Sequence, residues 1–496
     1  MAYPTFHNVI GGELLPALSG KTILNLNPAD HADVVGAFPS SHADDVALAV
    51  AAAKKAFATW RLVPAPKRAE ILVRAGILLK ERKEQYARDM TREMGKVLDE
   101  TRGDVQEAID EAFFVAGEGR RLYGQTTPSE LQNKFAMSVR MPVGVVGLIT
   151  PWNFPMAIPS WKLFPALVSG NTCVIKPATD TPLSTYNLVQ TLVDAGLPPG
   201  VVNIVSGSGS AVGTPLVEHP DVRAISFTGS SEVGSQVAQC AAARFKPVSL
   251  EMGGKNAQIV MDDANLELAL DGALWGAFGT TGQRCTATSR ILLQKRIAAE
   301  FTAKLVARAA ALKVGNGLEA GIEVGPQVNA SQIETSKKYM AIALAEGAKL
   351  LTGGHPLTAG AYAHGYFFEP TVLGGVTPTM RIAREEVFGP VVSLLEFDTF
   401  EEAIEIANSI EYGLSTALYT KDVNRAFAAI RDLESGITYI NAPTIGAEVH
   451  LPFGGVKQTG NGHREGNGAI DFFTTWKAVY VDYSDKLQRA QIDNAE

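Results

Sequence analysis

One cysteine stands among polar residues, in a segment whose residue types suit a reactive nucleophile. The segment reads TTGQRCT at residues 280–286, and Arg284 directly precedes Cys285. The thiolate is the reactive form of cysteine, and a nearby guanidinium or helix N-terminus lowers the pKa of a thiol. Cys173 and Cys240 instead lie among mainly apolar residues, as buried structural cysteines usually do. The sequence therefore predicts Cys285 as a nucleophile, which needs a base elsewhere in the chain.

A glutamate earlier in the chain is the candidate base. Glu251 stands between Leu250 and Met252 and is followed by two glycines. Most glutamates are simply solvated. Burial between apolar neighbours would raise the pKa of this carboxyl and so suit it to general base catalysis. We expect Glu251 to point into a cleft and to act together with Cys285.

An α/β fold must position these residues, because strand-like and helix-like segments alternate from about residue 143 to 250. Such alternation is typical of a parallel sheet with helices on both faces, in which ligands bind at the carboxyl ends of the strands. A strand-rich segment over 1–40 precedes it, and Gly95 is expected to separate two long helices. The predicted strands are 143–150, 172–177, 201–205 and 224–228, and the predicted helices are 46–60, 66–94, 97–123 and 184–195.

Two of the strand ends are rich in glycine, as turns that hold a dinucleotide are. GSGSAVG at 207–213 follows one strand, and TGSSEVG at 228–234 follows another and opens a helix. Neither matches the strict dinucleotide fingerprint, and tight strand-to-helix turns also need glycine. Lys176, just past an apolar strand, could reach a ribose or phosphate or could be a solvated loop lysine. From the residues alone, a dinucleotide site and a structural turn both stay open.

Composition and charge exclude several other classes of protein. A chain of 496 residues with 46% hydrophobic residues is typical of a globular protein with two or three domains. The net charge of −8 and the lack of a basic block argue against nucleic-acid binding. Three widely spaced cysteines indicate a reducing compartment, and no apolar run could span a membrane, so a cytoplasmic protein without a membrane partner is expected. The scattered histidines predict no metal site.

Seven short motifs resemble those of the aldehyde dehydrogenase superfamily in their order and spacing. They are PWNFP at 151–155, KPA at 176–178, FTGS at 227–230, LEMGGKN at 250–256, GQRC at 282–285, EVFGP at 386–390 and PFGG at 452–455. The resemblance covers nearly the whole chain. The alternative from another class is a non-catalytic dinucleotide-binding structural protein, since fold does not fix function. It predicts loss of Cys285, Glu251 or Asn153, and all three are present.

The resemblance implies an α/β fold with a Rossmann-like cofactor domain, an α/β catalytic domain and a small β oligomerisation arm. It also implies a homodimer or homotetramer. The expected domains are 1–124 and 143–250 for the cofactor, 251–440 for catalysis, 125–142 and 470–496 for the arm and C-terminal tail, and 441–469 for a return to the cofactor domain and the rim of the substrate pocket.

The resemblance further implies oxidation of an aldehyde by NAD or NADP through covalent intermediates on Cys285. Addition of the sulfur gives a thiohemiacetal oxyanion, held by the side-chain amide of Asn153 and the backbone N–H of Cys285. Loss of hydride to the nicotinamide leaves a thioester, which a water deprotonated by Glu251 hydrolyses. The residues expected around the cofactor are Trp152, Lys176, Thr179, Gly213, Gly229, Ser230, Glu386 and Phe388.

One departure from the family pattern bears on the choice of cofactor. Many strictly NAD-dependent members carry a glutamate three residues after the lysine that corresponds to Lys176, whereas this chain has Thr179. The change removes a repulsion against a 2′-phosphate, so use of NADP is expected. Lys162 and Glu465 match positions sometimes linked to proton movement, and they could instead form a structural ion pair.

The substrate prediction depends on Arg284. It resembles the arginine that semialdehyde-oxidising members place near the distal carboxylate of the substrate. Segments 441–450 and 482–487 look like those of relatives that act on ketoglutaric or aminoadipic semialdehyde, which favours an ω-semialdehyde acid such as 2,5-dioxopentanoate. In the alternative, Arg284 forms only an ion pair. The pocket would then accept neutral aromatic or aliphatic aldehydes, lined by Phe154, Trp161 and Phe453.

Overall fold

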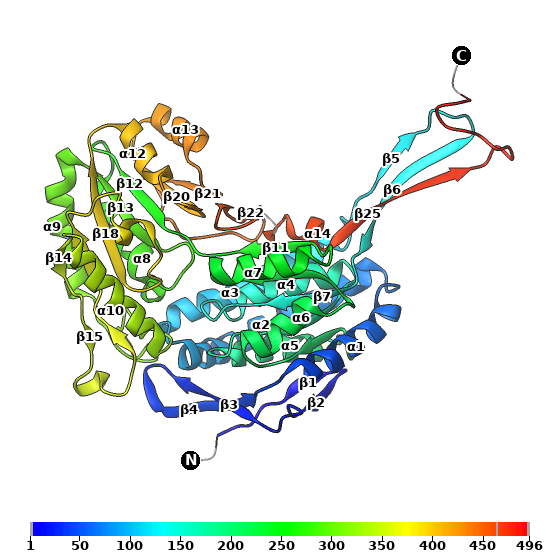
Figure 1. Ribbon diagram of the computed structural model, residues 1–496, viewed down its shortest axis with the longest axis horizontal. Coiled ribbons are helices and arrows are strands. Elements are labelled where there is room, and N and C mark those ends of the chain that lie inside the picture. The colour runs from blue at the N-terminus through cyan, green and yellow to red at the C-terminus, as the bar shows by residue number, and fades with distance from the viewer. Residues whose placement is uncertain (1–2, 463–464, 494–496) are drawn as a thin grey trace.

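Two seven-stranded sheets form the body of the protein in a computed structural model, which describes residues 3–462 and 465–493 (Figure 1). The first sheet has the order β11-β10-β7-β8-β9-β1-β2. Its strands are β1 (Asn8–Ile10), β2 (Glu13–Leu15), β7 (Val145–Ile149), β8 (Thr172–Lys176), β9 (Val202–Ile204), β10 (Val222–Thr228) and β11 (Val248–Glu251). The five strands from β7 to β11 pair in parallel, and β1 and β2 close one edge in antiparallel pairing.

Helices cover both faces of the first sheet, because successive residues of its strands point to opposite sides. In β8, Cys173 and Ile175 pack into one apolar core and Val174 into the other. The expected break at Gly95 is confirmed: this residue ends α2 with φ of 93°, a left-handed conformation that favours glycine. The helices are α1 (Ala43–Trp60), α2 (Ala65–Met94), α3 (Leu98–Glu118), α4 (Ala157–Val168), α5 (Pro182–Asp194), α6 (Thr214–Glu218) and α7 (Ser231–Ala242).

The second sheet has the order β14-β17-β18-β13-β12-β20-β21 and likewise separates two apolar cores. Only β14 runs antiparallel to its neighbour. The strands of the second sheet are β12 (Asn256–Val260), β13 (Thr288–Gln294), β14 (Lys349–Thr352), β17 (Thr371–Gly374), β18 (Val391–Phe397), β20 (Ser415–Tyr419) and β21 (Ile437–Ile440). The helices around it are α8 (Leu266–Phe278), α9 (Lys295–Ala311), α10 (Ala330–Ala345), α11 (Arg381–Arg384), α12 (Phe400–Asn408) and α13 (Val423–Asp432).

A three-stranded antiparallel arm projects from the body, as Figure 1 shows. It consists of β5 (Gln125–Pro128), β6 (Lys134–Pro142) and β25 (Thr474–Asp482), and β25 follows the short helix α14 (Ala469–Phe472). A hairpin of β3 (Thr22–Asn27) and β4 (Asp30–Pro39) lies near the N-terminus. The α/β fold class is confirmed. In the described parts of the chain, no helix is both long and apolar enough to span a membrane.

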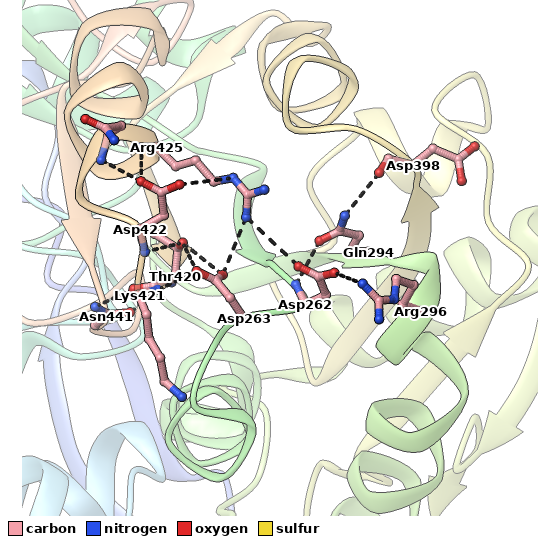
Figure 2. A network of polar contacts seen from close by, with 11 residues as sticks. Asp262, Asp263, Gln294, Arg296, Asp398, Thr420, Lys421, Asp422, Arg425 and Asn441 are labelled. Atoms are coloured by element: carbon pink, nitrogen blue, oxygen red, sulfur yellow. Dashed lines mark hydrogen bonds and ion pairs between the residues drawn. The ribbon is translucent and has the colours of Figure 1, made fainter.

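The two sheets present opposite ends of their strands to the cleft between them. The segment with Asn153 follows the carboxyl end of β7, and Glu251 ends β11, whereas Cys285 precedes β13 and Asn256 begins β12. At the carboxyl ends of the second sheet, Figure 2 shows a polar network in which Arg425 lies between Asp422, Asp263 and Asp262. The guanidinium of Arg425 therefore offsets part of the charge of three carboxylates on the side of the second sheet away from the cleft.

Candidate active site

Two cavities in the cleft share a wall at Cys285. The glycine-rich cavity, of about 280 Å³, includes Trp152, Asn153, Gly229, Ser230, Gly253, Glu386 and Phe388 in its lining. The aromatic cavity, of about 130 Å³, includes Glu107, Phe154, Trp161, Glu251, Arg284, Phe453 and Glu465. Cys285 and Thr228 line both cavities, together with Ile158 and Met252. A group bound in one cavity can therefore react at the sulfur with a group bound in the other.

The loop before Cys285 is held in an unusual backbone conformation. Thr280 and Thr281 have φ of 54° and 58°, a left-handed conformation that β-branched residues rarely adopt. The carboxylate of Glu100, on α3, accepts a hydrogen bond of 2.6 Å from the Thr280 N–H. The Thr281 hydroxyl donates to the Gly325 carbonyl at 2.9 Å. Contacts from outside the loop thus fix the position from which the cysteine is presented.

The pKa of Cys285 shifts in the direction opposite to the sequence prediction. Burial raises the pKa of this thiol to about 12, and the nearby carboxyls of Glu251 and Glu386 add to the effect. Arg284 does not counter it, because the guanidinium turns toward Glu100 at 3.4 Å and toward the Thr280 hydroxyl at 2.8 Å. The expected lowering of the thiol pKa by Arg284 is therefore wrong, and the resting Cys285 is a neutral thiol, which would need a base to act as a nucleophile.

The other two cysteines differ from each other in burial. Cys173 is fully buried in β8, as predicted. The prediction that Cys240 is buried is wrong: it is half-buried, and its sulfur lies 3.5 Å from Arg244 Nη1. Its polar neighbours are Arg244, just past the end of α7, and Glu218, at the end of α6.

Glu251 lies in the wall of the aromatic cavity that also holds Cys285. Its side chain is buried, and neither carboxyl oxygen has a hydrogen-bond partner among the described residues. Burial is the main cause that raises the pKa of Glu251 well above its usual range, and the negative charge of Glu465 contributes. A carboxylate in this position binds a proton more readily than a solvated one, as a general base requires.

Two asparagines fix the backbone around the sulfur. The Asn153 amide donates a hydrogen bond of 3.1 Å to the carbonyl of Gln283, two residues before Cys285. The Asn256 amide donates to the Cys285 carbonyl at 2.7 Å. The first amide lines the glycine-rich cavity beside the nucleophile. Sequence reasoning missed the second residue, although Asn256 ends one of the seven motifs.

The glycine-rich cavity fits a dinucleotide at three points. Ser230 caps α7 by accepting a hydrogen bond from the Val233 N–H, which leaves the positive end of this helix dipole beside the cavity, where a pyrophosphate is favoured. A Cβ at Gly253 would lie 2.0 Å from Glu386 Oε2, so a larger residue here would displace this carboxyl from its place in the cavity wall. The rings of Trp152 and Phe388 meet edge to face at 5.2 Å. A nicotinamide bound here would supply the hydride acceptor.

Three predicted cofactor residues lie outside the lining of this cavity. Lys176 ends β8, is buried, and donates a hydrogen bond of 2.7 Å to the Pro177 carbonyl. A Cβ at Gly213 would lie 3.6 Å from the Lys176 side chain, so these two residues are neighbours. Thr179 is half-buried. The sequence reasoning missed Asp180, which opposes the lowering of the Lys176 pKa caused by burial.

All four predicted substrate residues line the aromatic cavity: Phe154, Trp161, Arg284 and Phe453. The rings of Trp161 and Phe453 meet edge to face at 5.3 Å. Lys162 forms a buried ion pair with Glu465 and donates to the Ser226 hydroxyl at 2.8 Å. The sequence did not lead us to predict Glu107 in this cavity wall, although its helical spacing from Glu100 indicates that both lie on one face of α3.

The sequence model described as the aldehyde dehydrogenase family matches residues 16–479 of this chain. The chain belongs to this family. An alpha-ketoglutaric semialdehyde dehydrogenase of Bacillus subtilis is 43% identical over 96% of this chain and 98% of its own length. A succinate-semialdehyde dehydrogenase [NADP(+)] of Escherichia coli is 40% identical over 92% and 94%. The solved structure of a betaine aldehyde dehydrogenase from Staphylococcus aureus in complex with NAD+ covers 97% of this chain and 95% of its own, with TM-score 0.94 and 35% identity. This aldehyde dehydrogenase uses NAD or NADP.

Proposed function

We propose that this aldehyde dehydrogenase oxidises an ω-semialdehyde acid, such as 2,5-dioxopentanoate, to the corresponding dicarboxylic acid. The supporting observation is Arg284 in the wall of the aromatic cavity. Its Nε and Nη2 bind Thr280 and Glu100, whereas its Nη1 donates no hydrogen bond to the described residues. This nitrogen is available to a substrate carboxylate while the aldehyde carbon is at Cys285. The Bacillus subtilis relative is named for a substrate of this class.

In the proposed reaction, Glu251 accepts the proton of the Cys285 thiol as the sulfur adds to the aldehyde carbon. The Asn153 amide and the Cys285 backbone N–H stabilise the oxyanion that forms, and one such donor typically contributes about 10²–10³ in rate. When bound, NAD or NADP would accept the hydride from this adduct, which leaves a thioester on Cys285. Glu251 then releases the thiol proton to solvent and accepts a proton from the water that attacks the thioester carbonyl carbon. The Cys285 thiolate leaves and takes up that proton as the carboxylic acid forms.

Neutral aromatic aldehydes are the second candidate substrates. The edge-to-face pair of Trp161 and Phe453, with Phe154 in the same wall, offers apolar rings to a benzaldehyde-like substrate. In this case Arg284 serves only its ion pair with Glu100. The two candidates make opposite forecasts for a change at Arg284.

The test compares 5-oxopentanoate with pentanal, which differ only in the distal carboxylate. We expect kcat/KM for the acid to exceed that for pentanal by at least roughly tenfold, because charged hydrogen bonds contribute about 1.5–3 kcal/mol. Arg284→Met alone would leave Glu100 as an unpaired buried charge, so the double variant Arg284→Met/Glu100→Gln is compared with Glu100→Gln. The preference for the acid over pentanal should survive in Glu100→Gln and disappear in Arg284→Met/Glu100→Gln. A wild type that prefers pentanal or benzaldehyde refutes the semialdehyde proposal.

We further propose that the enzyme is a cytoplasmic homodimer or homotetramer held together through its arm. Apolar side chains remain strongly exposed there, with 52% of Trp476 and 68% of Tyr480 accessible to solvent. Large exposed apolar patches mark interaction surfaces. Light scattering after gel filtration tests this: Trp476→Glu/Tyr480→Glu should shift the mass toward that of a monomer. A wild type with the mass of one chain contradicts the proposal.

A further inference from the structure

Helix α3 carries four acidic residues on one face, and only two of them have a cationic partner. Residues 100, 104, 107 and 111 follow one another at helical spacing. Glu100 pairs with Arg284, and Asp104 forms a buried pair of 2.7 Å with Lys96. Within residues 3–462 and 465–493, no hydrogen bond or ion pair reaches the carboxyl of Glu107, and both oxygens of Glu111 are buried without a partner.

Glu107 is the member of this row that lines the aromatic cavity. The same wall carries Glu251, Glu465 and Arg284. Lys162 neutralises Glu465, and Glu100 already neutralises much of the charge of Arg284. If Glu107 and Glu251 were both ionised, a substrate carboxylate would enter a cavity of net negative charge. Because Glu251 must be ionised to act as the base, binding of an anionic substrate is favoured when Glu107 is protonated.

The surroundings of Glu107 favour its neutral form. Burial raises the pKa of Glu107 to about 8, the negative charge of Asp104 adds to this, and Lys96 and Arg284 oppose it. At neutral pH this group is a carboxylic acid, and it is a carboxylate above about pH 8. The other ionisable groups around it are Asp110 and Glu111 on α3, Tyr439 on β21, and Glu251, Cys285 and Glu465 in the cavity.

We propose that Glu107 is a specificity-determining residue: its carboxylic acid donates a hydrogen bond to the distal carboxylate of the substrate, beside the free Nη1 of Arg284. This rests on the proposed function, because it needs a substrate with such a carboxylate. An O–H group that donates to a carboxylate makes a short, strong bond. After Glu107 loses its proton, the same side chain repels the substrate. One residue thus ties the preference for an acid over a neutral aldehyde to pH.

The measurement is the ratio of kcat/KM for 5-oxopentanoate to kcat/KM for pentanal, followed from about pH 7 to about pH 9. Steps at Cys285 and Glu251 are common to both substrates, so their titrations cancel in the ratio. For a group of pKa about 8, the protonated fraction falls about tenfold over this range. We expect the wild-type ratio to fall by up to about tenfold, chiefly through the KM of the acid.

Two variants separate this role from a structural one. Glu107→Gln keeps a hydrogen-bond donor but cannot ionise, so its ratio should not change with pH. The matched control is Asp99→Asn, which removes an exposed carboxylate from the same helix that neither lines the cavity nor shifts the pKa of Glu107; its ratio should fall as in the wild type. A purely structural role of Glu107 would lower kcat/KM for both aldehydes equally and leave the pH dependence of the ratio intact.

The outcomes distinguish this inference from the proposed function. If the acid is preferred at neutral pH and the wild-type ratio is flat with pH, the role of Glu107 is overturned and the semialdehyde proposal stands. The same conclusion follows if the ratio falls with rising pH as much in Glu107→Gln as in the wild type. If the wild type does not prefer the acid at any pH, both proposals are refuted. The wild-type profile alone decides the first case, so the test holds even if a variant does not fold.

Discussion

Replacement of Glu251 by glutamine separates the two proton transfers proposed for this carboxylate. In the first it accepts the proton of the Cys285 thiol, and in the second it accepts a proton from the hydrolytic water. The variant still holds the sulfur, the Asn153 amide and both cavities in place. We expect a single-turnover burst of reduced cofactor in Glu251→Gln, followed by very slow steady-state turnover.

The rate of this burst follows from the thiol pKa. With a value of about 12, roughly one Cys285 thiol in 10⁴ is ionised at about pH 8, since each pH unit below the pKa lowers the thiolate fraction about tenfold. Without the carboxylate, addition to the aldehyde depends on that fraction. The burst rate of Glu251→Gln should therefore rise about tenfold per pH unit. The wild-type burst should be faster and less steep, because Glu251 accepts the proton directly.

Stopped-flow absorbance of the reduced nicotinamide measures both the amplitude and the rate of the burst. Cys285→Ser should show no burst, and Glu396→Gln, at an exposed position of β18, should behave as wild type. A burst in Glu251→Gln with an amplitude near one per active site supports the separation of the two transfers. Absence of a burst at every pH would show that acylation itself needs Glu251. A burst whose rate does not change with pH would refute the neutral resting thiol.

Three further predictions concern stability and cofactor binding. Lys162→Met leaves Glu465 buried without its partner, so denaturant unfolding should show a free energy of unfolding lower by about 3–5 kcal/mol. The double variant Lys162→Met/Glu465→Gln should regain most of this stability, and an unchanged unfolding midpoint in Lys162→Met would contradict the buried pair. Thr179→Glu introduces a carboxylate at the position predicted to face the ribose, so the ratio of kcat/KM for NADP to that for NAD should fall; an unchanged ratio would show that other residues set the cofactor preference. Gly253→Ala places a Cβ 2.0 Å from Glu386 Oε2, so NAD binding followed by tryptophan fluorescence should weaken roughly tenfold or more. The control Gly103→Ala, whose Cβ meets nothing within 4 Å, should bind NAD normally, and equal affinities would show that Glu386 does not hold the cofactor.

Local chemistry made much of the fold predictable from sequence. Strand and helix alternation identified the α/β class, and Gly95 marked the end of α2 because the left-handed cap there favours glycine. The apolar neighbours of Glu251 correctly indicated a raised carboxyl pKa. Each of these inferences depends on residues within a few positions of one another.

The errors arose where side-chain direction or tertiary packing decides the outcome. Arg284 is next to Cys285 in sequence, yet its guanidinium points to α3, so adjacency wrongly predicted a lowered thiol pKa. Helical spacing places Glu107 on the same face as Glu100, but only the packing of α3 in the cleft shows that this face reaches a cavity. No local sequence pattern indicates that the two sheets present opposite ends of their strands to the cleft.

The contact of Glu100 with the Thr280 N–H has a consequence for protein engineering. It joins a helix of the first half of the chain to the loop that carries the nucleophile in the second, and Arg284 adds a second link to the same carboxylate. Chimeras that exchange the cofactor half between two homologous enzymes would part these groups. Such hybrids should keep α3 and residues 279–285 from one parent, even at the expense of a longer donor segment.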